Sequence, residues 1–403
     1  MLNKKQQEAF KAVVNGNEQI VILTGAGGTG KSHTTAEIIK AFKGTVALTA
    51  TTHKARENIS HMAQEEAFTT QSYMGFRMVK QGYEMNLIQT GPIANPCALL
   101  IVDETSMLPK NVYKAIIKNL GNTIHKVLFL GDDIQLEAVG EGITLDDIPG
   151  YHIELTEQMR QKDVHPEVTR YLAELRDLIK QNKGVEDMPL MPKNCDDFVN
   201  LTNYRDFAEL YVATTGDKKC IAYRNTVVNK MNNYIVGNET YNIGDEVVLD
   251  APIGKKVKNG AVVQIWEVKE DPKFDRENVT VIADDGNQYT LHHWHSKAAF
   301  AKEIKKARHI HDEDHFWYLT ERNVGMKHRY AVTCYKSQGS SYGTVFIDFT
   351  DLWKAHDQAP TQWNNPITFN SFARMVYVAL SRMRNKAVVF TGDLRKYQFL
   401  GAT

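Results

Sequence analysis

The sequence predicts an α/β protein with two parallel-sheet units, a β-hairpin inserted in the first unit and a small β-barrel inserted in the second. Three observations lead to this fold class. The first third of the chain alternates short apolar runs with helical periods, and buried parallel strands have the form of such runs. A second set of apolar runs appears late in the chain. Within this second set, between its first two runs, strand-like segments are separated by Gly, Asn and Asp turns.

The first unit has four strand candidates, and each is a short apolar run. They are Ile20–Leu23, Val46–Thr49, Ala98–Val102 and Val127–Leu130. Helical periods such as "HKARENISHMA" and "KNVYKAIIKNL" lie between these runs. Strands that are joined through helices run parallel, so the alternation predicts an open α/β sheet.

The second unit also has short apolar strand runs, and a segment of a different pattern is inserted among them. Its strand candidates are "CIAYRN", "YAVTCY", "TVFIDF" and "KAVVFTG". Between the first two, from about Tyr241 to Val324, the chain reads "GDEVVL", "AVVQIWEV", "NVTVIADDG" and "NQYTLHHW". Short strands with close turns of this kind indicate a small β-barrel inserted into the second unit.

Composition limits the class of protein. The chain has 403 residues, of which 42% are hydrophobic and 24% charged, as in soluble globular proteins. It has no apolar stretch of membrane length and no N-terminal signal segment, so we expect no membrane association. Its four cysteines form no C-x-x-C pair, which indicates reduced thiols and a cytoplasmic location. The formal net charge is zero, so any nucleic-acid site must be a local basic groove.

The stretch "GAGGTGKS", Gly25 to Ser32, matches the phosphate-binding pattern G-x-x-x-x-G-K-[ST]. A chance match is the alternative, but the strand-like "IVIL" before it and the helical "TTAEIIKAF" after it supply the required context. Glycines let the backbone N–H groups surround phosphate oxygens, Lys31 reaches the β- and γ-phosphates, and Ser32 ligates Mg²⁺. The sequence therefore predicts ATP and Mg²⁺ as ligands, with binding residues Gly25, Gly27, Gly28, Thr29, Gly30, Lys31 and Ser32.

Further polar residues follow apolar runs. In "LLIVDETSM", Asp103 suits a metal ligand and Glu104 a water-activating base, and the alternative is an acidic loop start. In "LFLGDDIQLEAVG", Gln135 suits a γ-phosphate sensor, although Gly-Asp after a strand is also an ordinary turn. Arg160 and Arg382 are distant arginines that can stabilise charge on a transferred phosphoryl group, and the alternative for each is a surface ion pair.

Taken in order, these motifs resemble those of superfamily-1 helicases over the whole chain. The resemblance covers "LNKKQQEAF", "GAGGTGKS", "ATTHKA", "TTQS", "VDETSM", "GDDIQLEAVG", "LTEQMRQ", "AYRNTVVNKMN", "VTCYKSQGSS" and "YVALSR". The G-D-x-x-Q-L form and the inserted barrel are similar to the 1B branch, and within it to the Dda helicases of tailed phages and the RecD group. Departures are Tyr335 and Gln71 in place of His, and Glu137 and Ala138 in place of a Pro pair.

The resemblance implies two RecA-like P-loop motor domains, 1–155 and 156–403, with ATP between them and 5′→3′ movement on single-stranded DNA. It implies a pin-like hairpin at 73–96 and an SH3-like barrel at about 241–327. Gln6 would read adenine, and Gly339 and Arg382 would face the nucleotide. Implied partners are single-stranded DNA and duplex junctions, with replication or single-strand-binding proteins as further candidates. We expect a monomer, in the cytoplasm of a bacterial host if the chain is phage-encoded.

The expected DNA track follows the carboxyl ends of the parallel strands, where ligands of open α/β sheets bind. Its residues are Thr52, His53, Lys54, Thr70, Ser72, Thr333, Tyr335, Lys336 and Gln338. His293 and Trp294 are added because Trp294 could stack on a base beside the cations of "KAAFAKEIKKARH"; equally, Trp294 could fill the barrel core. The histidine-rich "LHHWHS" and "RHIHDEDH" suggest either a metal or a polar surface, and no second Cys/His cluster completes a metal site.

The segment "YMGFRMVKQGYEMNLIQTGPIANP" predicts two strands around a Gln81-Gly82 turn. We expect its apolar side chains to meet the last base pair of a duplex, and the alternative is a hairpin that only covers the sheet. These side chains are Phe76, Tyr83, Met85, Leu87 and Ile88.

Two other functions stay open. One is an RNA-directed helicase of the same superfamily. The other is a nucleotide-switched module such as a GTPase, for which "VVNKMN" lacks the final Asp of the guanine-reading pattern N-K-x-D.

Overall fold

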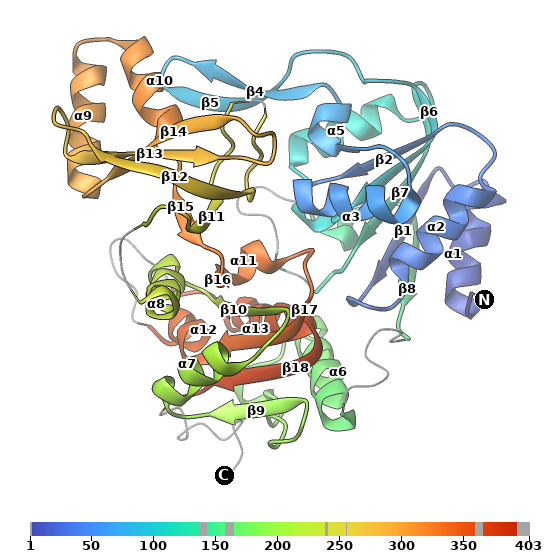
Figure 1. Ribbon diagram of the computed structural model, residues 1–403. Helices are drawn as coiled ribbons and strands as arrows, with labels where there is room; N and C mark the ends of the chain where they lie inside the picture. The colour runs from blue at the N-terminus through green and yellow to red at the C-terminus, as the bar shows by residue number, and fades with distance from the viewer. Residues whose placement is uncertain are drawn as a thin grey trace. The chain divides into compact units, whose positions relative to one another are not determined.

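The computed structural model describes residues 2–134, 136, 143–157, 165–237, 241–254, 256–358 and 366–392 (Figure 1). The chain forms two compact units, each built from separate segments. The first unit comprises Met1–Arg77, Gln89–Arg224 and Val332–Thr403. The second comprises Met78–Ile88 and Asn225–Ala331. No described helix has both the length and the apolar composition that a membrane span requires.

The first unit contains a six-stranded sheet in the order β3-β2-β6-β7-β1-β8, and all its recorded pairings are parallel. Its strands are β1 Ile20–Gly25, β2 Val46–Ala50, β3 Ala67–Thr69, β6 Cys97–Asp103, β7 Ile124–Gly131 and β8 Tyr151–Leu155. The four strands predicted from apolar runs are present, because those runs can bury both faces only between helices. The short strands β3 and β8 were not predicted.

Five helices connect these strands. They are α1 Lys4–Val14, α2 Lys31–Ala41, α3 His53–Ala63, α4 Thr70–Tyr73 and α5 Lys110–Asn119. Polar N-caps begin several of them: Asn3 and Gln6 form a reciprocal capping box on α1, and the Thr52 hydroxyl accepts a hydrogen bond from Ala55 at the start of α3. These caps set where each helix leaves the carboxyl edge of the sheet.

The same unit holds a second sheet, in the order β16-β10-β17-β18-β9. Its strands are β9 Phe198–Leu201, β10 Lys218–Ala222, β16 Ala331–Thr333, β17 Tyr342–Asp348 and β18 Met383–Phe390. The pairs β10–β17, β17–β18 and β18–β9 are parallel. The molecule is thus a mixed α/β protein with parallel sheets, consistent with RecA-like motor domains, as predicted.

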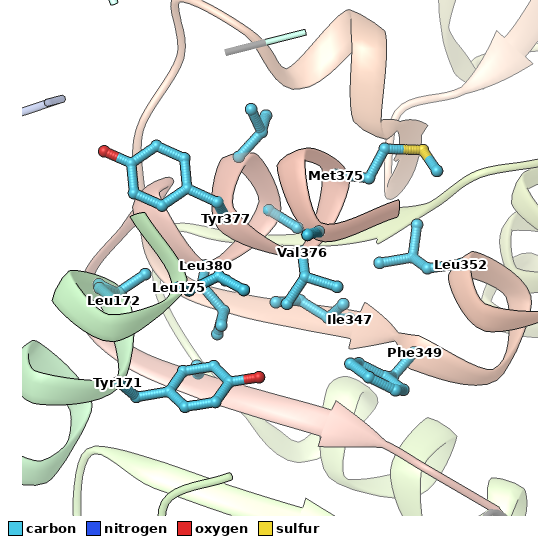
Figure 2. Packing of buried hydrophobic residues seen from close by; sticks show 14 of the residues in the cluster. Tyr171, Leu172, Leu175, Ile347, Phe349, Leu352, Met375, Val376, Tyr377 and Leu380 are labelled. Atoms are coloured by element: carbon cyan, nitrogen blue, oxygen red, sulfur yellow. The ribbon is translucent and has the colours of Figure 1, made fainter. Parts of the chain in front are cut away.

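Helices α6 Pro166–Lys180, α7 Tyr204–Ala213, α11 Cys334–Ser337, α12 Phe349–Asp357 and α13 Phe369–Ser381 surround this sheet. Figure 2 shows how α6, α12 and α13 meet over β17: Leu175 and Leu380 lie beside Ile347, and Phe349 packs at the other end. The run "MVYVALS" in α13 is buried on all sides, because other elements cover the whole helix. Arg382 follows directly after this rigid helix.

The second unit contains a five-stranded antiparallel sheet in the order β14-β13-β12-β11-β15. Its strands are β11 Glu246–Leu249, β12 Val262–Glu270, β13 Arg276–Ile282, β14 Gln288–Trp294 and β15 Met326–His328. Alternate residues such as Val263, Ile265, Val279 and Val281 form its core. Helices α8 Asn225–Val236, α9 Lys297–His309 and α10 Glu313–Arg322 complete the unit. The sequence interpretation did not include α9 and α10, and the SH3-like barrel stays a prediction.

Strands β4 Phe76–Gln81 and β5 Glu84–Gln89 form a two-stranded hairpin that both units share. Gly82 adopts φ 58° in the turn, a left-handed conformation that favours glycine. The turn residues are Gly82 and Tyr83, because Gln81 belongs to β4. At the base, the amide of Thr90 donates to the Gly75 carbonyl at 2.9 Å. The tip therefore belongs to the second unit although its stem begins in the first.

Candidate nucleotide and nucleic-acid site

The phosphate-loop pattern lies between β1 and α2. Gly28 and Gly30 have φ 91° and 90°, and Gly30 is the N-cap of α2. A Cβ on Gly25 would lie 2.7 Å from the Leu155 carbonyl oxygen and from Thr29 Oγ1. Lys31 Nζ donates to the carbonyl oxygens of Gly25, at 2.5 Å, and Ala26, at 3.1 Å. The loop thus combines glycine-only backbone, an ammonium group and a helix N-terminus, which together suit a triphosphate.

Gln6 is hydrogen-bonded to the backbone of the phosphate loop. Its side chain is 1% exposed, its Oε1 accepts from the Asn3 amide at 3.0 Å, and its Nε2 donates to the Thr29 carbonyl oxygen at 3.3 Å. Both ends of the amide are therefore held by backbone groups. This arrangement makes Gln6 a positioning residue for the loop, and its adenine contact stays a prediction.

Two partly buried carboxyl groups, those of Asp103 and Glu104, lie at the end of β6 in the middle of the first sheet. Asp103 Oδ1 accepts a hydrogen bond from the Glu104 amide at 2.9 Å. Glu104 has φ 52°, a left-handed conformation that is uncommon outside glycine and is often found at functional sites. Its carbonyl oxygen accepts from the Thr51 hydroxyl at 2.8 Å, which helps to hold that backbone.

Burial raises the pKa of Asp103, while the Glu104 amide and the charge of Lys31 oppose the shift. Burial, and then the charge of Asp103, raises the pKa of Glu104 to about 7, against the opposing charges of Arg382 and Lys31. Two adjacent, partly buried carboxyls near one lysine are a donor set that a divalent cation would hold ionised. Asp103 therefore suits a Mg²⁺ ligand beside a bound nucleotide, and the Mg²⁺ role of Asp103 and Ser32 stays a prediction.

Arg382, which follows helix α13 beside the second sheet, lies next to the phosphate loop of the first sheet. It is 5% exposed at the C-cap of α13, where its Nε donates to the Val378 carbonyl oxygen at 3.1 Å and one terminal nitrogen donates to Ser381 Oγ at 2.9 Å. A Cβ on Gly27 would lie 3.6 Å from the same terminal nitrogen, so the guanidinium borders the phosphate loop. Gly339 also borders the site, because a Cβ there would lie 3.8 Å from Glu104 Oε1.

The sequence interpretation missed Arg176, which connects the two sheets. Its guanidinium lies 3.3 Å from Asp132 Oδ1, 3.0 Å from Asp133 Oδ1 and 2.8 Å from Glu154 Oε1. Tyr377 of α13 adds its hydroxyl at 3.3 Å. A signal was present in the sequence: Arg176 occupies an apolar stripe with Leu172 and Ile179, at i, i+4 and i+7, and an arginine on a buried face needs buried acceptors.

Two predicted catalytic residues, Gln135 and Arg160, lie outside the described residues. The structure describes the residues on either side of Gln135. The Asp132 carboxylate accepts from the Ile134 amide at 3.2 Å, and the Leu136 carbonyl oxygen accepts from Gln338 Nε2 at 3.3 Å. Ile134 and Leu136 are therefore each held by a hydrogen bond within the first unit.

The predicted track residues of the first sheet lie at its carboxyl edge, beside the nucleotide residues. Thr52 and Thr70 follow β2 and β3, while the phosphate loop follows β1, further along the same sheet. His53, Lys54 and Ser72 are exposed. Thr70 is fully buried, and its hydroxyl donates to Thr49 Oγ1 at 3.2 Å. Thr70 thus contributes to packing in this structure, whereas its neighbours present polar groups to solvent.

In the second sheet, the track residues follow β16. Thr333 caps α11 by accepting from the Lys336 amide at 3.3 Å, and the Lys336 side chain is exposed. Tyr335 is half-buried against the core, and Gln338 is 8% exposed. Asn58 of α3 donates to the Gly339 carbonyl oxygen at 2.8 Å, so the track segments of both sheets meet within the first unit.

His293 and Trp294 lie in the second unit, at the end of β14. The Trp294 ring packs against Phe274, with centroids 6.1 Å apart, Phe300, at 5.5 Å, and the Arg276 guanidinium. His293 Nδ1 lies 3.2 Å from Glu277 Oε2. Trp294 thus packs against α9 and the start of β13 and is not one of the barrel-core residues, and its stacking on a base stays a prediction. Across the described ranges, no group of three or more His, Cys, Asp or Glu side chains is arranged to hold a metal ion.

The hairpin tip packs on α10 within the second unit. Trp317 Nε1 donates to the Gly82 carbonyl oxygen at 3.0 Å, and Lys80 pairs with Glu321 at 2.6 Å. The Tyr83 and Phe316 rings meet edge to face at 4.9 Å. Of the predicted fork-contacting residues, Phe76 is buried and Tyr83 is engaged, whereas Met85 is 44% exposed. Met78, which was not predicted, is 55% exposed.

The fold and site together define a P-loop protein in which residues of two sheets meet at one candidate nucleotide site. The AAA domain family model matches residues 1–185. A stretch of 130 residues is 32% identical to the ATP-dependent RecD2 DNA helicase of Deinococcus radiodurans. That stretch is 32% of this chain and 17% of the relative, so the chain matches less than a fifth of the relative's length.

Two solved structures are similar over nearly the whole chain. A Candida albicans Pif1 helicase is 18% identical, with a TM-score of 0.45, over 98% of this chain and 96% of that one. A Bacteroides Pif1 bound to single-stranded DNA is 16% identical, with a TM-score of 0.48, over 98% and 94%. The comparisons confirm the resemblance to superfamily 1B helicases that the motifs predict.

Proposed function

We propose that this chain is an ATP-dependent DNA helicase of the superfamily 1B type, similar to the Dda and RecD helicases. One observation carries the proposal: Arg382 of the second sheet borders Gly27 of the phosphate loop, and its charge acts on Glu104 of the first sheet. A site completed by two sheets can couple nucleotide hydrolysis to relative motion of those sheets. The 32% identity to a RecD2 DNA helicase supports the same class.

The residues suggest these roles in ATP hydrolysis. The phosphate-loop amides and Lys31 bind the β- and γ-phosphates, and Ser32 and Asp103 hold Mg²⁺, which when bound neutralises phosphate charge. Glu104 accepts a proton from the attacking water, for which a pKa of about 7 is well matched. Arg382 donates to the γ-phosphate as charge develops on it, and Gln135 and Arg160 are proposed to assist.

For the track, we propose that exposed groups at the carboxyl edges hold the phosphate backbone of single-stranded DNA without reading bases. Lys54, Ser72 and Lys336 are the exposed members that support this role.

The proposed motor domains are 1–155 and 156–403, and movement is proposed to run 5′ to 3′. The exposed Met78 and Met85 of the hairpin are proposed to meet the duplex. An RNA-directed helicase is the alternative.

The test compares Arg382→Ala with Arg384→Ala. Arg384 is 46% exposed and pairs with Asp217, so it is a matched control two residues away. We expect Arg382→Ala to leave ATP binding within about tenfold of wild type but to lower DNA-stimulated turnover by ~10³ or more, the size of effect that arginine fingers have. Arg384→Ala should hydrolyse ATP normally. Near-normal turnover in Arg382→Ala would show that the assignment is wrong.

Strand displacement on duplexes with a 5′ or a 3′ tail, in DNA and in RNA, tests the polarity and the substrate. We expect displacement only from a 5′ tail of DNA. Displacement from a 3′ tail would overturn the polarity, and preference for an RNA tail would favour the RNA-directed alternative.

A further inference from the structure

Helix α9, Lys297–His309, is strongly basic in a chain whose net charge is zero. Its only acidic residue is Glu303. Its basic residues are Lys297, Lys302, Lys305, Lys306, Arg308 and His309. Nothing in the proposed ATPase site or the track uses them. Such a concentration of one charge is the local basic surface that a neutral protein needs for binding a polyanion.

The lysines lie on one face of the helix. Phe300 packs against Trp294, and Ala307 is fully buried, so these residues mark the inner face. At about 100° per residue, Lys302, Lys305 and Lys306 fall within an arc of roughly 100° on the opposite side. All three are exposed. The outer face of α9 therefore presents three ammonium groups over about 6 Å of helix axis.

The same helix touches the hairpin tip. The Arg308 guanidinium lies 5.6 Å from the Tyr83 ring centre and 5.2 Å from that of Phe316. Both α9 and the tip belong to the second unit, where α10 lies beside α9 and its Trp317 donates to the Gly82 carbonyl oxygen of the tip (Figure 1). The basic face is thus built into the unit that carries the exposed Met78 and Met85.

We propose that Lys302, Lys305 and Lys306 bind the phosphate backbone of the duplex arm ahead of the hairpin tip. The chemistry of the face favours duplex over single strand. Single-strand sites interleave cations with large aromatic rings that stack on bases, and this arc of α9 contains no Phe, Tyr or Trp residue. Contact with duplex backbone needs only cations at the surface. The inference rests on the proposed helicase function and extends it with a second nucleic-acid site.

The experiment measures binding by the full chain rather than unwinding. The variant is Lys302→Gln, Lys305→Gln and Lys306→Gln together, since Gln keeps helix propensity and removes charge. The control is Lys110→Gln, Lys114→Gln and Lys118→Gln on α5, three exposed lysines with the same total charge. The probes are a 5′-tailed DNA hairpin duplex, the same tail alone, and a fork with both tails, each titrated by fluorescence anisotropy between about 50 and 200 mM salt.

We expect wild type to bind the tailed duplex more tightly than the tail alone, and the α9 variant to lose that gain. Its salt slope on the tailed duplex should fall by up to about 2.7, as expected for three phosphate contacts, with the tail-only slope unchanged. The α5 control should resemble wild type.

Four results would overturn the inference: no gain from the duplex in wild type, an unchanged gain in the α9 variant, an equal loss on the tail alone, or a loss confined to the fork with both tails. A duplex gain that depends on α9 without measurable tail binding would instead contradict the proposed track, so the two failures are distinguishable.

Discussion

Glu104 combines a left-handed backbone with a partly buried carboxyl group that lies beside a second carboxyl. Because burial and Asp103 raise its pKa to about 7, the folded protein favours the protonated form at mildly acidic pH. Strain and a shifted pKa at one residue are typical of functional sites, where the surrounding fold maintains an unfavourable arrangement.

The pH dependence of stability tests this environment in the nucleotide-free protein. A carboxyl whose folded pKa is raised contributes stability that is complete below its unfolded pKa, near 4.5, and that is lost as pH rises through about 7. Glu104→Gln stays neutral, so between pH 5 and 8 its free energy of unfolding should fall less than that of wild type, by on the order of 2 kcal/mol. Urea unfolding at each pH measures this difference.

Glu66→Gln is the matched control, because Glu66 is exposed. Its unfolding free energy should follow wild type across the same pH range. Parallel pH profiles for wild type and Glu104→Gln would contradict the raised pKa.

At the scale of one element, α6 anchors the segment that follows β7. Arg176 is 14% exposed and Asp132 is fully buried, so their ion pair is shielded from water. The charges of Asp132 and Asp133 outweigh burial and raise the pKa of the Arg176 guanidinium. Arg374 of α13 adds a hydrogen bond to the Asp133 carbonyl oxygen at 2.7 Å. Two helices of the second sheet thus fix one loop of the first.

Removing this arginine should be costly. We expect Arg176→Gln to lower the free energy of unfolding by about 3 kcal/mol, because it removes the positive charge that balances the buried Asp132 carboxylate. Arg170→Gln on the same helix removes an exposed pair with Glu174 and should cost under about 0.5 kcal/mol. Denaturant unfolding of both variants decides this prediction, and equal losses would mean that the Arg176 network contributes no special stability.

Sequence reasoning succeeded where a local pattern carries the information. The strand β1, the glycine loop and Lys31 follow from apolar runs and spacing, and Asp103 and Glu104 follow from their place after a strand. It failed for β3 and β9, whose short runs contain too few apolar residues to stand out. It also missed the acceptors of Arg176, since their positions depend on packing between the sheets.

At the scale of the whole molecule, two insertions from different sheets form the second unit. The hairpin tip is held there by Trp317, Tyr83 and Lys80, while Met78 and Met85 stay exposed. This division suggests that hydrolysis and strand separation can be changed independently, because the exposed methionines belong to the second unit and the proposed ATPase residues to the first.

Substituting both methionines tests that division. We expect Met78→Asn with Met85→Asn to keep DNA-stimulated ATP hydrolysis within a few-fold of wild type but to slow duplex unwinding at least ~10-fold, as for loss of stacking on a base at the fork. The control is Leu190→Asn with Val212→Asn, two exposed apolar residues of the first unit. If the hairpin variant unwinds at the wild-type rate, the hairpin is a surface cover and the separating element lies elsewhere.

The shared hairpin also has a consequence for how the chain matures during synthesis. The hydrogen bond from Trp317 to Gly82 joins residues 235 positions apart, and β10 pairs with β17 only after the whole of 225–331 has been made. A ribosome adding roughly 5–20 residues per second therefore leaves the tip without its partner for about 10–50 s. Throughout that interval Tyr83 lacks the ring of Phe316. The emerging chain therefore exposes a hairpin with an uncovered aromatic side chain, which favours aggregation and which a holdase chaperone would protect.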